Sequence, residues 1–125
     1  IISNVTMTTK DIIMVDLGNV HDVLPNISLL DDYEVFAFAD MAYNGLGVKP
    51  KLPNVQLFHD KSGLKNAADI QLIWNVFEIA NRQDLPEKIY ICTKDIQFRS
   101  IAHLVCDFNI HFVSCWTDLQ NEIFN

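Results

Sequence analysis

The chain has 125 residues, of which 50% are hydrophobic and 20% are charged. This composition suits one folded domain covering residues 1–125 and excludes a disordered chain. Sixteen acidic residues against nine Lys and Arg give a net charge of -7, opposite to the basic surface that holds nucleic acid electrostatically. Any nucleic-acid contact is therefore expected to be local or to depend on a metal ion. No apolar run reaches the about 20 residues of a membrane helix, so no membrane contact is predicted.

The sequence contains three cysteines, Cys92, Cys106 and Cys115. Their odd number and the lack of a CxxC spacing are typical of free thiols in a reducing compartment. We therefore expect an intracellular, cytoplasmic protein whose cysteines are buried and inert. Met7 is expected to be the native first residue, with residues 1–6 a remnant ahead of it.

Five short, continuously apolar segments are predicted to be strands that are covered on both faces. They are Ile12–Val15, Val35–Ala39, Val55–Phe58, Lys88–Cys92 and Ile110–Val113. Helical patterns alternate with them, which favours a three-layer α/β/α sandwich with a mainly parallel five-stranded sheet. Six strand residues are expected to be mostly buried: Ile13, Val15, Phe36, Phe38, Ile89 and Ile91.

The segments between the strands carry helix and loop signals. Asn19–Leu30 contains Pro25, which favours a short or broken helix, and Met41–Pro53 has the Gly and Pro content of a loop or flap. Apolar residues recur at helical spacing in Phe98–Val105, which predicts an amphipathic helix, and Trp116–Phe124 is expected to form a terminal helix.

The clearest helix lies between the third and fourth strands. Its apolar face carries Asp69, Leu72, Ile73, Val76 and Ala80 at helical spacing, and Pro86 follows its end. Two aromatic residues of the same helix, Trp74 and Phe77, are expected to belong to the core, with base stacking as the less favoured alternative.

Three aspartates are candidates for a common site. Asp16 directly follows the first strand and Asp95 closely follows the fourth, so both belong at the carboxyl edge of the sheet, where ligands gather in such folds. Asp69 lies on the apolar stripe of the main helix, and an inward carboxylate without a partner is costly. A hard cation such as Mg²⁺ or Mn²⁺ would remove that cost. The three carboxylates are therefore predicted to ligate one metal ion.

Structural alternatives exist for each aspartate. Asp69 lies three residues after Asn66 and could be the acidic half of a capping box. Asp95 could cap the next helix, and Asp16 could stabilise the turn after its strand. Capping and metal ligation are compatible.

Other polar residues are weaker candidates. Asn19 could steer a water on the metal or a phosphate, and Lys65 and Lys94 stand close to the acids and could contact phosphate. The chain has no nucleotide-binding glycine motif and no GxSxG motif. The histidines show no ligand spacing, so ordinary polar packing is expected for His21, His59, His103 and His111.

Three segments together resemble a known family, the NYN domains of the PIN-like ribonuclease superfamily. IIMVDLGNV carries Asp16 and Asn19 like the opening D-x-x-N motif, and GLKNAADIQL carries Asn66, Ala67 and Asp69 like the N-A-x-D helix start. The third segment is YICTKDIQF, whose residues Thr93, Lys94, Asp95 and Phe98 match an [ST]-K-D-x-x-F pattern. The likeness covers residues 11–114.

This resemblance implies a PIN-like fold with strand order 3-2-1-4-5. It also implies an endoribonuclease that hydrolyses a phosphodiester through a metal-activated water, with Asp16, Asp69 and Asp95 as ligands of Mg²⁺ or Mn²⁺ and catalytic residues. Asn19 is then a polar helper of catalysis. RNA is the expected partner, contacted by four substrate-binding residues, Lys65, Asn66, Thr93 and Lys94.

The chain departs from the family at several acidic positions. Gly18 stands where a Glu is frequent, an acid is missing near Gln97 and Arg99, and Asn75 is an amide where some relatives carry an acid. Fewer carboxylates favour one ion over two. Two alternatives therefore stay open: a catalytically degenerate PIN-like module that binds protein or nucleic acid, and a small regulatory α/β domain of flavodoxin-like shape.

Overall fold

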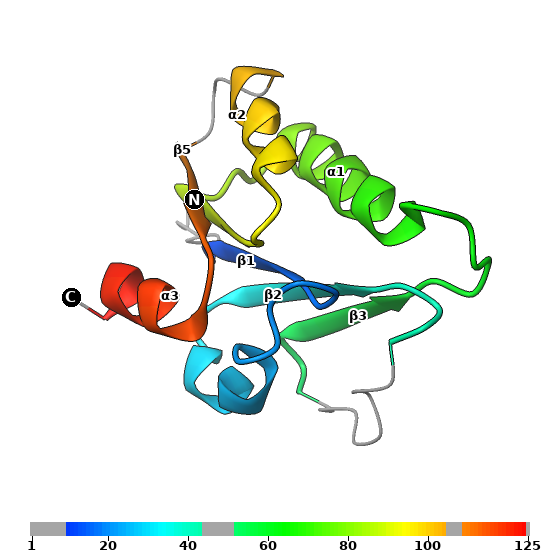
Figure 1. Cartoon of the computed structure of the whole chain (residues 1–125). Helices are drawn as coiled ribbons and strands as arrows, with labels where there is room; N and C mark the ends of the chain where they lie inside the picture. The colour runs from blue at the N-terminus through cyan, green and yellow to red at the C-terminus, as the bar shows by residue number, and fades with distance from the viewer. Residues whose placement is uncertain (1–9, 44–51, 105–108, 125) are drawn as a thin grey trace.

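The computed structural model describes residues 10–43, 52–104 and 109–124. Five strands, three α-helices and two 3₁₀ segments alternate along these residues (Figure 1). In chain order they are β1 (Ile12–Asp16), η1 (Leu24–Leu30), β2 (Glu34–Ala39), β3 (Val55–His59), α1 (Ala67–Ala80), β4 (Lys88–Cys92), η2 (Ile96–Ser100), α2 (Ile101–Leu104), β5 (Asn109–Val113) and α3 (Trp116–Ile123).

The five strands form one parallel sheet in the order β3-β2-β1-β4-β5. The central strand β1 pairs with β2 through Ile13 opposite Val35, and with β4 through Ile13 opposite Tyr90. All five predicted strands are confirmed to within a residue at each end, and so is the predicted order. The strand order reverses between β1 and β4, and in open parallel sheets ligands commonly bind outside the carboxyl ends of the strands at such a reversal.

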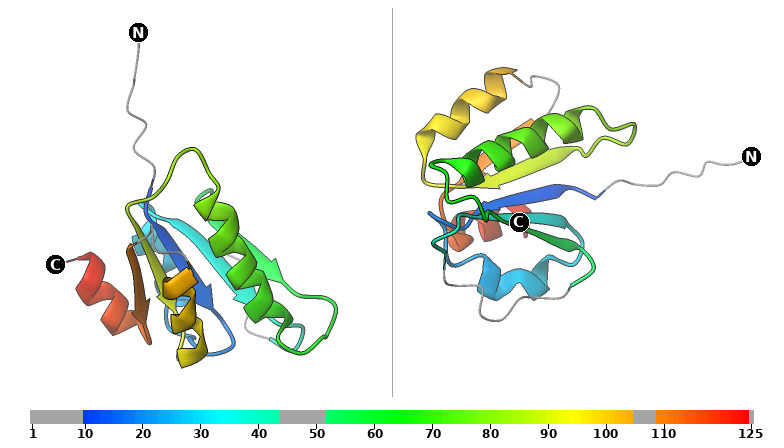
Figure 2. Two further views of the ribbon diagram at one scale, coloured as in Figure 1. Left: turned by 90° about the horizontal axis from the view of Figure 1, so that it is seen from above. Right: turned by 90° about the vertical axis from the view of Figure 1, so that its right-hand side faces the viewer.

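Side chains alternate between the two faces of the sheet and create two separate apolar clusters. Ile13, Val15 and their neighbours on one face pack with residues of η1 and α3. Ile12, Met14 and their neighbours on the other face pack with residues of α1, η2 and α2. Figure 2 shows these helices on opposite sides of the sheet, which confirms a three-layer α/β/α sandwich. All six strand residues predicted for the core are at most 3% exposed.

Helix α1 covers one face of the sheet with a narrow apolar stripe. Leu72, Val76 and Ile79 are buried against β1 and β2, as the helical spacing predicts. The core placement of Trp74 was wrong, because its side chain is 62% exposed on the outer face of α1. Phe77 is partly buried and packs against the cluster under the helix.

The segment after β4 begins as a 3₁₀ helix and not as the predicted α-helix. A regular amphipathic helix was expected over Phe98–Val105, but the chain first forms the 3₁₀ segment η2 and only then α2. The apolar stripe is nevertheless used, since Phe98 and Ile101 are both 3% exposed. Val105, at the end of the predicted helix, lies outside the described residues.

Other expectations are corrected or lie outside the described residues. Cys92 is buried, whereas Cys115 is only partly buried, which corrects the expectation that every cysteine is buried. Cys106, residues 1–6 and most of the predicted flap Met41–Pro53 lie outside the described residues. None of the described helices has the length and hydrophobicity needed to cross a membrane.

Candidate functional site

Asp16 ends β1 and lies at the centre of a small hydrogen-bond network. It is 3% exposed, and its Oδ2 accepts hydrogen bonds from the side-chain amide of Asn19 at 2.7 Å and from the hydroxyl of Thr93 at 2.8 Å. The Thr93 hydroxyl in turn accepts a hydrogen bond from the backbone N–H of Asp95 at 3.1 Å. These contacts fix the Asp16 carboxylate and connect the end of β1 to the segment after β4. Asn19 and Thr93 are therefore positioning residues for Asp16.

Two of the structural alternatives are confirmed at Asp95 and Asp16. Asp95 caps η2, because its Oδ1 accepts a hydrogen bond from the backbone N–H of Gln97 at 3.0 Å. The backbone carbonyl of Asp16 accepts hydrogen bonds from the N–H groups of Asn19 and Val20, which closes the turn after β1. The backbone around both residues is thus held by hydrogen bonds at the carboxyl edge of the sheet.

Asp69 is half-buried in the first turn of α1, and its surroundings disfavour a charge there. Burial raises the pKa of its carboxyl, and the negative charges of Asp16, Asp95 and Asp40 raise it further. The capping-box alternative is wrong, because Asn66 makes no side-chain capping bond and has a left-handed backbone with φ of 63°. The Asp69 carboxyl therefore lies within electrostatic range of acids from three different strand ends.

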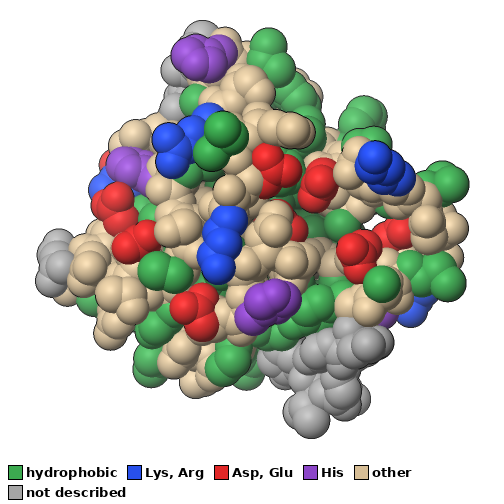
Figure 3. Space-filling view, in the orientation of Figure 1, with side chains coloured by type: hydrophobic (Ala, Val, Ile, Leu, Met, Phe, Trp, Pro, Cys, Tyr) green, Lys and Arg blue, Asp and Glu red, His purple; other side chains and the backbone are tan. Residues whose placement is uncertain are grey.

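A cavity of about 670 Å³ opens between the start of α1 and the segments that follow β2 and β3. Three carboxylates line it, from Asp40, Asp60 and Asp69, together with Lys65 and Asn66. Figure 3 shows several acidic side chains in the middle and right of the face turned to the viewer, with others on its left. Of the predicted site residues, Lys65, Asn66 and Asp69 line this cavity, whereas Asp16, Asn19, Thr93, Lys94 and Asp95 are not among its lining residues.

Asp40 and Asp60 were missed by the sequence analysis. Each directly follows a strand, β2 and β3, and this position was the available signal, since Asp16 was found by the same rule. Asp60 accepts hydrogen bonds from the Ser62 hydroxyl at 2.8 Å and from the N–H groups of Ser62 and Gly63. These donors, the Ser62 hydroxyl first, lower the pKa of Asp60 and keep it ionised. The pKa of Asp60 is therefore lowered and that of Asp69 is raised, although both residues line the same cavity.

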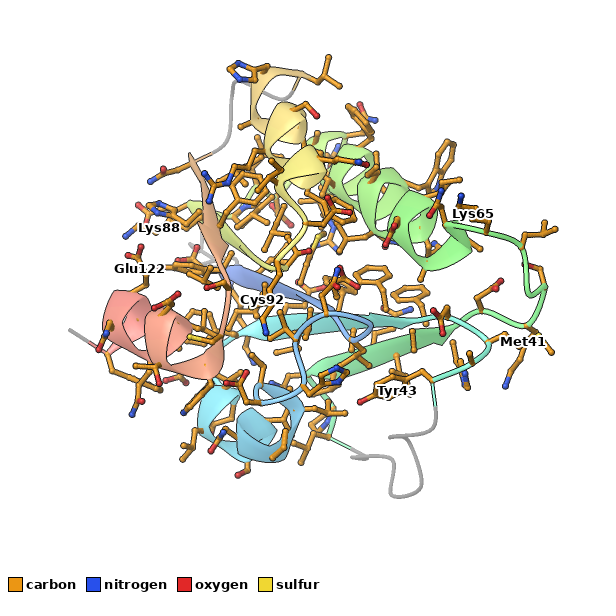
Figure 4. All side chains as sticks on the ribbon, in the orientation of Figure 1. Met41, Tyr43, Lys65, Lys88, Cys92 and Glu122 are labelled. Atoms are coloured by element: carbon orange, nitrogen blue, oxygen red, sulfur yellow. The ribbon has the colours of Figure 1, made fainter. Side chains whose placement is uncertain are left out.

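The lysines predicted to contact phosphate occupy different places. Lys65 lies at the cavity, where Figure 4 shows it just ahead of α1, while Met41 lines the cavity from the segment after β2. Lys94 is exposed in the segment after β4.

Among the histidines, His59 and His111 each have a buried Nε2 with no hydrogen-bond partner in the described residues, so the expected polar packing is incomplete there.

The acidic positions at which the chain departs from the NYN pattern have clear surroundings. A Cβ added at Gly18 would lie 3.5 Å from Asp16 Oδ1, an ordinary contact, so an acidic side chain at this position would stand beside Asp16. Asn75 is 8% exposed and donates to the Gln71 carbonyl of its own helix at 2.9 Å. Compared with the NYN pattern, this chain lacks a carboxylate at position 18 beside Asp16. The Asn75 amide of α1 has its hydrogen-bond partner within the helix.

Asp16 and Asp69 offer carboxylate oxygens, the donor type that hard divalent cations prefer. Within the described residues, no group of three or more His, Cys, Asp or Glu side chains is arranged to hold an ion. Mg²⁺ commonly takes one or two carboxylates and completes its shell with waters and substrate phosphates. Asp16, with one oxygen held by two donors, and Asp69, whose charge is disfavoured by burial and neighbouring acids, fit such a site.

Comparisons with protein-family models, with curated proteins and with solved structures find no match for this chain.

Proposed function

We propose that this protein is a metal-dependent endoribonuclease of the PIN-like type that hydrolyses phosphodiester bonds in single-stranded RNA. One observation carries the proposal: the carboxyl of Asp69 lies within electrostatic range of Asp16, Asp95 and Asp40 at the carboxyl edge of the sheet. Like charges gathered without a counter-ion repel one another, so this arrangement favours cation binding.

The proposal assigns separate tasks to the residues of the edge. Asp16, Asp69 and Asp95 would hold one Mg²⁺ or Mn²⁺ ion, directly or through waters. Such an ion supplies charge neutralisation at the phosphate and lowers the pKa of a bound water. Asn19 and Thr93 keep the Asp16 carboxylate oriented through their hydrogen bonds. Lys65 and Asn66 line the cavity, where they can contact the RNA backbone.

Cleavage of a fluorescent single-stranded RNA with millimolar Mn²⁺ tests the proposal. The wild type is expected to cut the strand and to stop when EDTA removes the ion. Asp69→Asn is expected to lose this activity, because the negative charge is removed and the remaining amide oxygen is a weaker ligand for the cation. Glu78→Gln makes the same carboxylate-to-amide change at an exposed position of the same helix and should leave the cleavage rate unchanged.

A wild-type preparation with no Mn²⁺-dependent cleavage would contradict the proposed activity. Equal rates for Asp69→Asn and Glu78→Gln would place the activity elsewhere or in a contaminant.

A second candidate function is a catalytically silent PIN-like module that binds protein or nucleic acid. The outer face of α1 favours it, because Ile70 and Trp74, one turn apart, are 63% and 62% exposed. Large exposed apolar side chains that lie together are typical of interaction sites. The silent module predicts that Trp74→Ala reduces partner binding, while Asp69→Asn leaves it unchanged.

A further inference from the structure

Two aromatic rings lie parallel beside the acidic edge of the sheet. His21 and Tyr43 have ring centroids 6.1 Å apart and planes inclined by only 3°. His21 belongs to the loop after β1 and Tyr43 to the segment after β2, which are neighbouring strands of the sheet. Figure 4 shows Tyr43 on the segment that follows β2, beside the loop that follows β1. The pair is therefore a tertiary feature of the carboxyl edge.

Hydrogen bonds hold the residues that flank His21 and the backbone N–H of Tyr43. Before His21, the N–H of Val20 donates to the Asp16 carbonyl at 2.9 Å, and after it Asp22 Oδ1 accepts from the backbone N–H of Trp116 at 3.0 Å. The N–H of Tyr43 donates to the Asp40 carbonyl at 3.2 Å, and the Tyr43 side chain packs against the apolar cluster of that face. These contacts reduce the backbone freedom that a ligand at the rings would have to remove.

The positions of the rings follow from the acids. The turn after β1 starts at Asp16 and leads to His21, and the turn after β2 starts at Asp40 and leads to Tyr43. A turn closed by a hydrogen bond between residues i and i+3 keeps their Cα atoms within about 7 Å. Tyr43 therefore stands next to Asp40, whose charge acts on Asp69.

We infer that the His21–Tyr43 pair is a platform on which a base of single-stranded RNA stacks. The inference rests on the proposed function and names how the substrate is held. A chain with a net charge of -7 attracts phosphates poorly, so RNA binding needs a contribution that does not depend on charge. Stacking on an aromatic face is such a term and accepts any base. Duplex RNA keeps its base faces covered and is a poor ligand for this platform.

NMR titration of the ring signals of His21 and Tyr43 tests the platform with two probes, an eight-nucleotide oligoadenylate and an abasic ribose-phosphate strand of equal length. EDTA is present throughout, so that no metal-dependent cleavage occurs. The wild type is expected to bind the oligoadenylate more tightly than the abasic strand, with shifts in both rings. Tyr43→Leu keeps apolar bulk at the core and is expected to weaken oligoadenylate binding by about 5- to 150-fold. Tyr43→Phe restores the ring and the affinity.

Matched histidine variants separate stacking from general charge effects. His21→Ala is expected to weaken oligoadenylate binding and to leave abasic binding unchanged, whereas His103→Ala, a change of another exposed histidine on α2, alters neither. Equal affinity of the wild type for the two probes overturns the platform, even if RNA is cleaved. Base-dependent binding without Mn²⁺-dependent cleavage supports the platform and contradicts the nuclease.

Discussion

At the scale of single residues, Asp16 and Asp69 carry the same side chain in different surroundings. Asp16 is nearly inaccessible, but two donors stabilise its carboxylate. The pKa of Asp69 is raised by burial and by neighbouring negative charges. Hydrogen bonds thus fix the orientation of the Asp16 carboxylate, whereas a nearby positive charge would lower the pKa of Asp69.

Asp69→Asn is expected to stabilise the metal-free protein near neutral pH. The folded-state pKa of Asp69 lies above its ordinary value of 3.8, so the folded protein holds more protons than the unfolded chain between these two pKa values. The free energy of unfolding therefore falls as the pH rises through that window, and the asparagine variant escapes this loss. Urea unfolding in EDTA, near neutral pH and well below pH 3.8, measures the effect.

The stabilisation by Asp69→Asn should vanish at the acidic pH, where Asp69 is protonated in both states. Glu78→Gln, the control on α1, should show no such dependence on pH. A stabilisation of the same size at both pH values would mean that removing a charge is not its cause.

Thr93→Val is expected to lower the free energy of unfolding by about 1.5 to 3 kcal/mol, the range for hydrogen bonds to charged groups. The substitution keeps the shape of a side chain that is 6% exposed and removes the donor to Asp16 and the acceptor for the Asp95 N–H. Chemical denaturation measures the loss, and Thr117→Val on an exposed position of α3 is the matched control. Equal stability of the two variants would show that the network contributes nothing.

At the scale of elements, both faces of the sheet are covered, so its inner strands are apolar without alternation. β1 is buried along its whole length, whereas the edge strand β3 is only partly buried. Helix α1 is covered on one side only, so its inner side is buried and Trp74 on its outer side is exposed. Strand order therefore decides how much of each apolar segment is covered.

Phe36→Ala is expected to destabilise the protein by about 3 to 5 kcal/mol, as large-to-small core changes do. Phe36 is 3% exposed in β2, and its ring lies 6.2 Å from that of Phe58 in β3. Urea unfolding is the measurement. Gln56→Thr changes the exposed residue opposite Phe36 in the sheet and is expected to stay within about 0.5 kcal/mol of the wild type. An unchanged midpoint for Phe36→Ala would contradict this account of the core.

At the scale of the whole molecule, the strand order concentrates negative charge at one edge. Asp16, Asp40 and Asp60 end or follow three neighbouring strands, and Asp95 follows β4 on the other side of β1. Parallel strands bring all these ends to the same edge, which gives a protein of net charge -7 a local acidic surface. Cations are the complementary ligands of this surface.

Mn²⁺ is expected to stabilise the folded protein by mass action, by about 2.7 kcal/mol at a hundredfold excess over the dissociation constant. Thermal unfolding with and without the ion measures the gain, and Asp69→Asn is expected to abolish it. Gly18→Glu adds a carboxylate beside Asp16 and should lower the concentration of Mn²⁺ needed. Thermal stability that ignores millimolar Mn²⁺ in all three proteins would refute a metal site at this edge.

The sequence by itself determined the strands, the buried stripe of α1 and the position of Asp16 and Asp95 after their strands, because these follow from hydrophobic patterns within short segments. The NYN resemblance added the strand order. Only the tertiary structure joined Thr93 to Asp16, 77 positions apart, and brought Asp40 and Asp60 to one cavity with Asp69.

The tertiary structure also leaves Trp74 exposed to solvent and places the rings of His21 and Tyr43 parallel to each other. Local periodicity describes a helix or a strand, but a contact between distant residues exists only once neighbouring strands and the helix that crosses them are in place. For this reason the sequence located the edge of the sheet, and the folded chain decided which side chains share it.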